Sequence, residues 1–297
     1  MGETLSVRAG VLDVGYERSG PRSGQPVVLL HGFPYDVRCY DRVTAILAEA
    51  GAYLLVPYLR GYGPTTFART STLRSGQQAA LAHDLLALIE ALELRRPIVA
   101  GFDWGGRAAC LASMLWPSRI AGLVTVGGYN VQDIPSSAAP ALPWVERARW
   151  YQYYFHTERG RSGLTIYRKE LARLLWKEWS PTWRHTDADF EATASSFDNP
   201  DFVDVVVHSY RHRYGLVAGD VAYQATEDII AAQPAITVPT IVIESLDNPS
   251  ALRRPDPHEE HFPNLIECRR VHAGHNVPQE NPAAFADAVL SLLAHVT

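Results

Sequence analysis

The segment Ala100–Gly106 (Ala-Gly-Phe-Asp-Trp-Gly-Gly) constrains the fold of this chain more than any other. It follows the short apolar run Pro97–Val99, which is typical of a buried strand, and it precedes small apolar residues at 108–116 that predict a buried helix. Its glycines permit a strained backbone and close packing of a helix on a strand. We therefore predict a sharp strand–turn–helix junction of the G-x-S-x-G type, with Asp103 at the position of the serine.

Asp103, at the tip of this turn, has two interpretations. A carboxylate raised above a sheet and beside a helix N-terminus is stabilised as an anion and can attack carbon to form an ester. Aspartate is also a good helix cap, and in that case Asp103 is only a structural residue. The motifs elsewhere in the chain favour the nucleophile.

Strands alternate with helices along most of the chain. The predicted strands are Ser6–Ala9, Leu12–Glu17, Pro26–Leu30, Tyr53–Val56, Pro97–Val99, Ile120–Val126, Val238–Ser245 and Leu265–Val271. The predicted helices are 38–50, 75–94, 108–116 and 282–295. This alternation predicts an α/β fold with a mainly parallel central sheet and helices on both faces.

The alternation stops at Gly127-Gly128 and resumes about a hundred residues later. The residues between are helical, polar and aromatic, with no convincing strand. We therefore predict a core domain at 1–130 and 229–297, interrupted by a helical lid, or cap, at 131–228. The tryptophans interpreted as the core of this lid are Trp176, Trp179 and Trp183.

Composition narrows the class of partner. The 297 residues carry a net charge of −5, which gives no reason to expect nucleic acid or an anionic membrane, and no apolar run reaches the length of a membrane span. The isolated cysteines Cys39, Cys110 and Cys268 fit a reducing compartment and provide neither a disulfide framework nor a zinc site. We expect a cytoplasmic protein with a small-molecule substrate, without a cofactor or metal; a homodimer is left open.

Two further motifs follow predicted strands. His31-Gly32-Phe33-Pro34 comes directly after Pro26–Leu30, so the backbone N–H of Phe33 can pair with that of Trp104 as an oxyanion hole. His275 comes after the last strand, in the chain order nucleophile, acid, histidine that triads on α/β folds follow. We predict that His275 is the general base.

The acid of such a triad should follow the strand that ends near residue 243. Glu244 and Asp247 both qualify. Asp247 lies in the loop with reach toward His275, whereas Glu244 is at the strand end, so we favour Asp247 and keep Glu244 as the alternative. The acid would hold the imidazole tautomer and stabilise the imidazolium.

On these residues the chain resembles the α/β-hydrolase superfamily over nearly its whole length, and within it the epoxide hydrolases and their dehalogenase relatives. The matching motifs are His31–Pro34, Arg60-Gly61-Tyr62-Gly63, Gly101–Gly106 and Gly274-His275. The resemblance implies that Asp103 attacks an sp³ carbon to give an alkyl-enzyme ester. Water activated by His275 and Asp247 would then hydrolyse that ester.

The resemblance also suggests how the leaving group is handled. Epoxide hydrolases of this kind use two lid tyrosines that protonate the opening oxygen, and Tyr151 and Tyr210 match these positions. A phenol with an ordinary pKa of about 10 stays protonated at neutral pH and can donate to an alkoxide. The residues expected to bind substrate are His31, Pro34, Arg107, Gln152 and Tyr153.

Two other functions stay open. A haloacid or haloalkane dehalogenase would use the same Asp103, Asp247 and His275, and Arg107 matches an arginine that binds carboxylate in haloacetate dehalogenases. However, Trp104 stands where those enzymes carry another arginine, and Phe33 stands where haloalkane dehalogenases often carry an asparagine. A non-catalytic ligand-binding protein of the same fold is the third alternative, which an intact triad disfavours.

Overall fold

The computed structural model describes residues 4–249 and 258–296. Within them, nine strands form one sheet in the order β1-β2-β4-β3-β6-β7-β8-β9, and β5 pairs with β2. The strands are β1 (Thr4–Ala9), β2 (Leu12–Ser19), β3 (Pro26–Leu30), β4 (Tyr53–Pro57), β5 (Thr66–Phe67), β6 (Ile98–Gly101), β7 (Gly122–Val126), β8 (Thr240–Ser245) and β9 (Leu265–Val271). All pairings from β4 to β9 are parallel, while those of β2 are antiparallel. The predicted mainly parallel sheet is confirmed.

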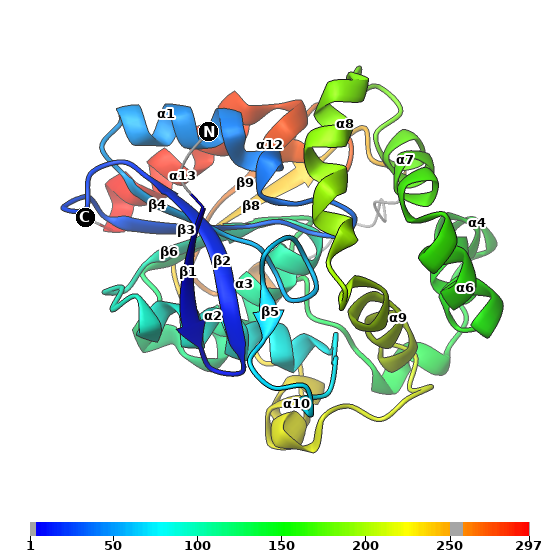
Figure 1. The fold of residues 1–297 in the computed structure, drawn as a ribbon. Coiled ribbons are helices and arrows are strands. Elements are labelled where there is room, and N and C mark those ends of the chain that lie inside the picture. Colours follow the sequence, from blue (N-terminus) through cyan, green and yellow to red (C-terminus); the bar gives the residue numbers. More distant parts are fainter. Residues whose placement is uncertain (1–3, 250–257, 297) are drawn as a thin grey trace.

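Helices cover both faces of this sheet (Figure 1). One face carries α1 (Asp41–Glu49), α12 (Val277–Glu280) and α13 (Pro282–Val296), and the other carries α2 (Gln78–Ala91) and α3 (Asp103–Leu115). The central strands β3, β6 and β7 are buried almost throughout, as expected for parallel strands between two helical layers. None of the helices within residues 4–249 and 258–296 is long and apolar enough to cross a membrane.

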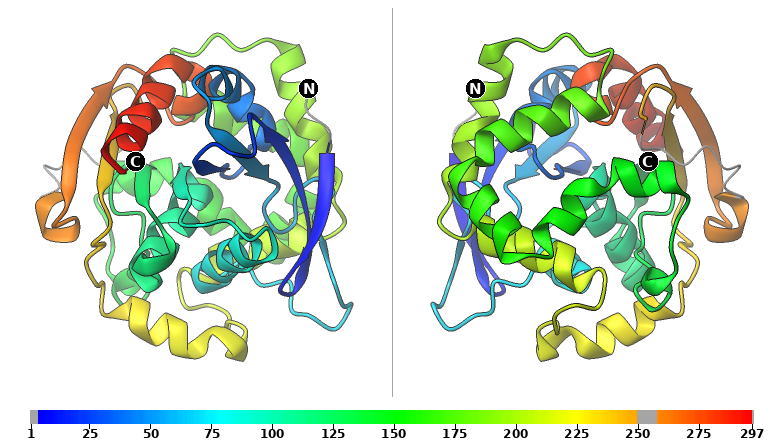
Figure 2. Two further views of the ribbon diagram at one scale, coloured as in Figure 1. Left: turned by 90° about the vertical axis from the view of Figure 1, so that its left-hand side faces the viewer. Right: turned by 90° about the vertical axis from the view of Figure 1, so that its right-hand side faces the viewer.

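Between β7 and β8 the chain forms the helical lid. Its helices are α4 (Pro143–Ala148), α5 (Trp150–Phe155), α6 (Glu158–Ile166), α7 (Arg168–Trp179), α8 (Asp187–Ala194) and α9 (Phe202–His212). They lie together at one edge of the core (Figure 1), and the right-hand view of Figure 2 shows them in front of the sheet. Trp176 and Trp179 are buried, as expected for lid core, while Trp183 is partly buried.

The end of the lid segment lies against the core domain. Helix α10 (Gln224–Ala231) crosses the predicted boundary at residue 228. Ile230 of this helix and Tyr223, the residue before the helix, form a buried cluster with Ala79 and Ala80 of α2. Short 3-10 turns occur at Val37–Tyr40, Pro117–Arg119, Pro135–Ala138, Ser195–Asp198 and Val221–Tyr223, and α11 spans His258–His261.

Helix α3 starts earlier than predicted. The apolar run suggested a first helical residue near 108, whereas the helix begins at Asp103 itself. Gly105 makes this early start feasible, because a Cβ at that position would lie 2.0 Å from the Leu30 carbonyl oxygen. The glycines therefore belong to the first turn of the helix, which packs directly on the end of β3.

Candidate active site

Asp103 lies where two neighbouring parallel strands end. Leu30 of β3 and Gly101 of β6 are register partners, and the chain leaves these strands toward opposite sides of the sheet. Such a switch point is where open α/β sheets bind their ligands. Asp103 has a φ of +50°, in the left-handed region, which aspartate tolerates better than most residues. The predicted sharp strand–turn–helix junction at Gly101–Gly106, called the elbow below, is therefore confirmed in its backbone.

The backbone after β3 contacts the Asp103 carboxylate. The Phe33 N–H donates to Asp103 Oδ1 at 2.8 Å. A Cβ at Gly32 would lie 2.5 Å from the Asp103 Cβ, so only glycine lets the two loops approach this closely. The Trp104 N–H belongs to the first turn of α3, whose N–H groups have no intrahelical acceptor. These are the two groups predicted to form an oxyanion hole.

His275 faces the other carboxylate oxygen. Its Nε2 is 3.7 Å from Asp103 Oδ2, which is too long for a hydrogen bond. The imidazole lies beside the Trp179 ring, with centroids 4.8 Å apart, and beside Phe102. Burial lowers the pKa of His275, although the negative charges of Asp103 and Glu280 partly oppose this. The imidazole is therefore neutral at neutral pH, as a general base must be.

The two predicted acids point elsewhere. The Asp247 N–H donates to the Ala273 carbonyl, and its Oδ1 lies 3.3 Å from Nδ1 of the exposed His272. Glu244 contacts His258 and Arg270 instead. Within the described residues neither carboxylate contacts His275, so the acid assignment stays a prediction from sequence.

Asn248 is a residue that the sequence analysis did not select. Its side-chain amide lies 3.3 Å from His275 Nδ1. The atom that faces the ring is the amide nitrogen Nδ2, which can donate to an unprotonated Nδ1, and in that tautomer Nε2 carries the ring proton and faces Asp103. Asn248 follows Asp247 directly, and sequence alone does not decide which of two adjacent loop side chains faces the histidine.

The loop that carries His275 is held by Glu280, also missed from sequence. Its carboxylate accepts the backbone N–H of Gly274 at 2.7 Å, that of Asn276 at 3.0 Å and the Ser180 hydroxyl at 2.6 Å. Ser180 Oγ in turn accepts the His275 N–H at 3.0 Å. A core carboxylate and the end of lid helix α7 thus fix the histidine together.

The two lid tyrosines, Tyr151 and Tyr210, lie side by side next to Phe33, whose backbone N–H is one of the predicted oxyanion-hole donors. The rings of Tyr151 and Tyr210 are 5.3 Å apart at their centroids, and both pack on Phe33. Tyr210 also lies 6.0 Å from Trp104. Burial raises the pKa of both phenols, so both stay protonated at neutral pH. The structure brings these predicted residues together with the elbow.

The other predicted substrate residues divide into two groups. His31 is buried in the core, where its Nε2 accepts the Leu59 N–H at 3.1 Å and burial lowers its pKa to about 4. The Pro34 carbonyl accepts the Trp176 indole N–H at 2.9 Å, which joins the core to the lid. Both contacts are structural, because they bind protein groups.

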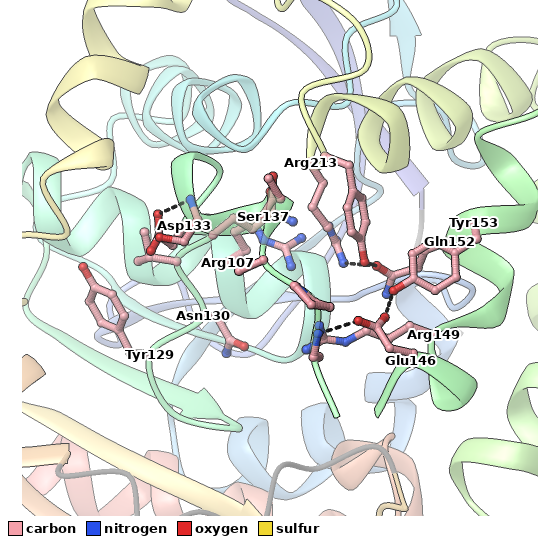
Figure 3. Close-up of a pocket in the computed structure, with 18 residues that line it drawn as sticks. Arg107, Tyr129, Asn130, Asp133, Ser137, Glu146, Arg149, Gln152, Tyr153 and Arg213 are labelled. Atoms are coloured by element: carbon pink, nitrogen blue, oxygen red, sulfur yellow. Dashed lines mark hydrogen bonds between the residues drawn. The ribbon is translucent and has the colours of Figure 1, made fainter. Parts of the chain in front are cut away.

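Arg107, Gln152 and Tyr153 line a pocket of about 830 Å³ between the core and the lid (Figure 3). Asp103, His275, Tyr151 and Tyr210 are outside its lining. Gln152 connects it to the tyrosines, since its Nε2 donates to the Tyr151 oxygen at 2.8 Å. The Tyr153 hydroxyl donates to the Glu146 carboxylate.

One cluster of metal-ligating side chains occurs among the described residues. Ligand atoms of Glu244, His258 and Cys268 lie within 4.8 Å of one another on the β8–β9 side of the sheet. The Glu244 carboxylate already contacts His258 at 3.0 Å and Arg270 at 3.1 Å. This cluster is separate from the elbow, and we assign it no function.

Known proteins resemble this chain over different lengths. A protein from Klebsiella pneumoniae, itself only proposed to be an epoxide hydrolase, is 42% identical with a TM-score of 0.96, covering 98% of this chain and 97% of that one. Potato (Solanum tuberosum) epoxide hydrolase I is 19% identical with a TM-score of 0.79, covering 99% and 100% of the two chains, and supports the fold alone.

Curated relatives match a shorter stretch. Epoxide hydrolase A of Mycobacterium tuberculosis is 29% identical over 155 residues, which is 52% of this chain and 44% of that protein. The match thus spans less than half the length of that relative. The model of the α/β-hydrolase fold family matches residues 25–282, most of the chain. The chain therefore belongs to the α/β-hydrolase fold family and resembles the epoxide hydrolases within it.

Proposed function

We propose that this protein hydrolyses an epoxide to a vicinal diol through a covalent ester on Asp103. The observation that carries the proposal is the pair of buried phenols, Tyr151 and Tyr210, packed together on Phe33 beside the elbow, where burial raises the pKa of both. An opening epoxide needs a proton on its oxygen, because an unprotonated alkoxide in a desolvated site is costly. The relatives from Klebsiella pneumoniae and Mycobacterium tuberculosis, by their names, support this assignment.

In the first step Asp103 Oδ2 attacks a ring carbon of the epoxide. The new C–O bond forms as the ring C–O bond breaks, and Tyr151 or Tyr210 transfers its proton to the released oxygen. The products are a hydroxyalkyl ester and a tyrosinate. Oδ1, which accepts the Phe33 N–H, becomes the ester carbonyl oxygen.

In the second step His275 takes a proton from water, and the hydroxide adds to Cγ of Asp103. The negative charge develops on Oδ1, where the N–H groups of Phe33 and Trp104 stabilise it. Collapse expels the diol oxygen, which takes the proton from the imidazolium. The new Asp103 carboxylic acid returns its proton to the tyrosinate, so one water is consumed for each epoxide.

The phenols provide the experiment that tests this function. We expect the double variant Tyr151→Phe, Tyr210→Phe to lose epoxide opening almost completely, because each acid contributes about 10²–10⁴-fold. Either single variant should retain part of the rate through the other phenol. The measurement is kcat on a terminal epoxide such as styrene oxide, with circular dichroism as the check on folding.

Tyr167, an exposed tyrosine between lid helices α6 and α7, provides the matched control. The Tyr167→Phe variant should keep the parent rate. Epoxide opening at the parent rate by the double variant would remove the tyrosines from the mechanism and with them the proposed function.

One observation favours dehalogenation as the second candidate. The indole N–H of Trp104 is buried without a hydrogen-bond acceptor among the described residues, and a halide beside the nucleophile would supply one. A halide leaves without a proton, so alkylation of Asp103 by a haloacid or alkyl halide should survive the double Phe change. If the parent protein and the Tyr151→Phe, Tyr210→Phe variant both release halide and neither opens an epoxide, the protein has this second function.

The contact of Asn248 with His275 predicts a pH effect. In the parent protein burial lowers the His275 pKa, so the acidic limb of the pH–kcat profile should lie below about pH 6.5. Asn248→Asp would place a negative charge near Nδ1, which favours the imidazolium. We expect this change to move the acidic limb upward by about 1 to 3 pH units.

Asp247→Asn provides the matched comparison, because its carboxylate contacts His272. It should leave the acidic limb in place if Asn248 is the partner of Nδ1. A downward move of the limb in Asp247→Asn, with none in Asn248→Asp, would restore Asp247 as the acid.

A further inference from the structure

Gln152, in α5, is a buried amide that joins a cation to one of the two lid phenols. The residue is 4% exposed. Its Oε1 accepts the Tyr214 hydroxyl at 3.0 Å and lies 3.4 Å from Arg213 Nη1. Its Nε2 lies 2.8 Å from the Tyr151 oxygen. Figure 3 shows the Arg213 side chain extending toward Gln152.

The partners of Gln152 determine which way round its amide lies. A guanidinium only donates hydrogen bonds, so the atom that faces Arg213 is the amide oxygen. The amide nitrogen then faces Tyr151, and because this nitrogen only donates, the Tyr151 oxygen is the acceptor. A phenol has a single proton, and this bond does not use it. The Tyr151 proton is therefore available for another acceptor.

The same bond stabilises the tyrosinate that a proton transfer leaves behind. Once Tyr151 has lost its proton, the Gln152 N–H donates to a charged oxygen, and such a bond is roughly twice as strong as a neutral one. The Arg213 cation at the other end of the amide polarises it in the same sense. A donor that binds the anion more tightly than the phenol makes the phenol the better acid.

Tyr210 has a different environment. Arg213 lies 4.8 Å from the centroid of its ring. Burial raises the pKa of Tyr210 well above its usual range, and the charges of Tyr151 and Asp103 raise it further, although Arg213 opposes them. Burial also raises the pKa of Tyr151, but Arg213 opposes this rise, and so do hydrogen bonds with Gln152 and Tyr210. The two phenols are thus unequal acids, although their rings lie side by side.

We propose that Tyr151 is the phenol that protonates the opening epoxide, and that Gln152 is the positioning residue that selects it. The assignment rests on the proposed function and deepens it, because it divides the work of the two phenols. As the ring C–O bond breaks, the Tyr151 proton passes to the released oxygen, and the tyrosinate accepts the Gln152 N–H. Tyr210 keeps its proton, and its hydrogen bond with Tyr151 stabilises the same tyrosinate.

The single phenol variants provide the first part of the test. We expect Tyr151→Phe to lower the rate constant for epoxide opening at least about 10-fold more than Tyr210→Phe does, because the remaining phenol is then the weaker acid. The measurement is rapid quench of single turnovers on styrene oxide, which separates ring opening from hydrolysis of the ester. Equal losses, or a larger loss in Tyr210→Phe, would overturn the assignment.

Changes at Gln152 test the amide itself. Gln152→Leu removes the donor and should lower the rate constant for opening by about 10- to 100-fold, with KM within about threefold of the parent value. Gln152→Glu keeps the length of the side chain and its pairing with Arg213, but it places an acceptor against Tyr151, which then holds the proton. It should be at least as slow as Gln152→Leu. A parent rate in Gln152→Glu would mean that the side chain only fills space, and would overturn the assignment.

A double-mutant cycle shows which phenol Gln152 serves. In the Tyr210→Phe background, Gln152→Leu should keep its full effect on the rate constant. In the Tyr151→Phe background it should change the rate less than about threefold, because its partner is gone. Equal effects in both backgrounds would make Gln152 a structural residue. Gln224→Leu, at an exposed amide of α10 that bonds to Asp228, is the matched control and should keep the parent rate.

The same variants distinguish failure of this assignment from failure of the proposed function. If the double variant Tyr151→Phe, Tyr210→Phe opens epoxides at the parent rate, both fail. If it is inactive while Gln152→Leu keeps the parent rate, the phenols stay in the mechanism and selection by Gln152 fails alone. Circular dichroism checks folding. Should Gln152→Leu not fold, Tyr214→Phe removes one anchor of the amide and should give a smaller loss that disappears in the Tyr151→Phe background. A loss that persists there would overturn the assignment.

Discussion

Replacing Asp103 by Asn is expected to abolish epoxide hydrolysis, by at least about 10⁴-fold in kcat, because the amide cannot attack the ring carbon. Asparagine is the sharper substitution at this position. Asp103 has a φ of +50°, and asparagine adopts that conformation more readily than alanine does. The elbow and the Phe33 contact can therefore persist without the nucleophile, and the loss of rate reports on the chemistry and not on folding.

The covalent route is tested by following oxygen. When excess protein acts once on an epoxide in water labelled with heavy oxygen, the ester mechanism places an Asp103 oxygen in the first diol. That diol should carry no label, and the label should appear in the peptide that contains Asp103. A labelled diol in the first turnover would mean direct attack by water and would contradict the ester. An inactive parent protein that nevertheless binds epoxides would indicate the ligand-binding alternative.

The sequence predicts those parts of the site that follow strands directly. Phe33 comes three residues after β3 and Asp103 two residues after β6, and the two strands are neighbours in register. Their meeting therefore depends only on strand order and on the glycines of the two turns. His275 is predictable for the same reason, since it follows β9 closely.

Side chains fixed by long loops and by the lid could not be predicted in this way. Asn248 and Asp247 are adjacent, and their orientations depend on the Asp247 N–H pairing with Ala273, which no local pattern reveals. Trp179 is predicted as lid core and is buried, but it also lies against His275.

That Nε and Nη1 of Arg107 have no hydrogen-bond acceptor among the described residues is likewise a tertiary property. The sequence marks Arg107 as a substrate residue only through resemblance. The side chains that the lid brings to Arg107 decide this arrangement, and burial together with the like charge of Arg213 lowers the pKa of Arg107, although the charge of Asp103 opposes the shift. Residues separated by about a hundred positions in the chain decide that arrangement, so periodicity and spacing do not contain it.

His275→Gln is expected to stop turnover after the first step, so that the ester accumulates. Glutamine fills much of the space between Trp179 and Phe102 but is not a general base. Asp103 still attacks, because the Phe33 N–H and the two phenols remain in place. Steady-state kcat should fall by at least about 10³-fold, while one rapid equivalent of epoxide disappears per protein.

Intact-protein mass spectrometry distinguishes the candidate functions in this variant. An epoxide adds all its atoms to the protein, since ring opening expels nothing, whereas an alkyl halide adds its mass less that of the hydrogen halide. The adduct should map to the peptide containing Asp103 and should be absent when Asp103→Asn is combined with His275→Gln. His272→Gln, a change at an exposed histidine in the same loop, should turn over without an adduct. An unmodified His275→Gln protein, after incubation with an epoxide that the parent hydrolyses, would show that His275 is needed before the ester forms.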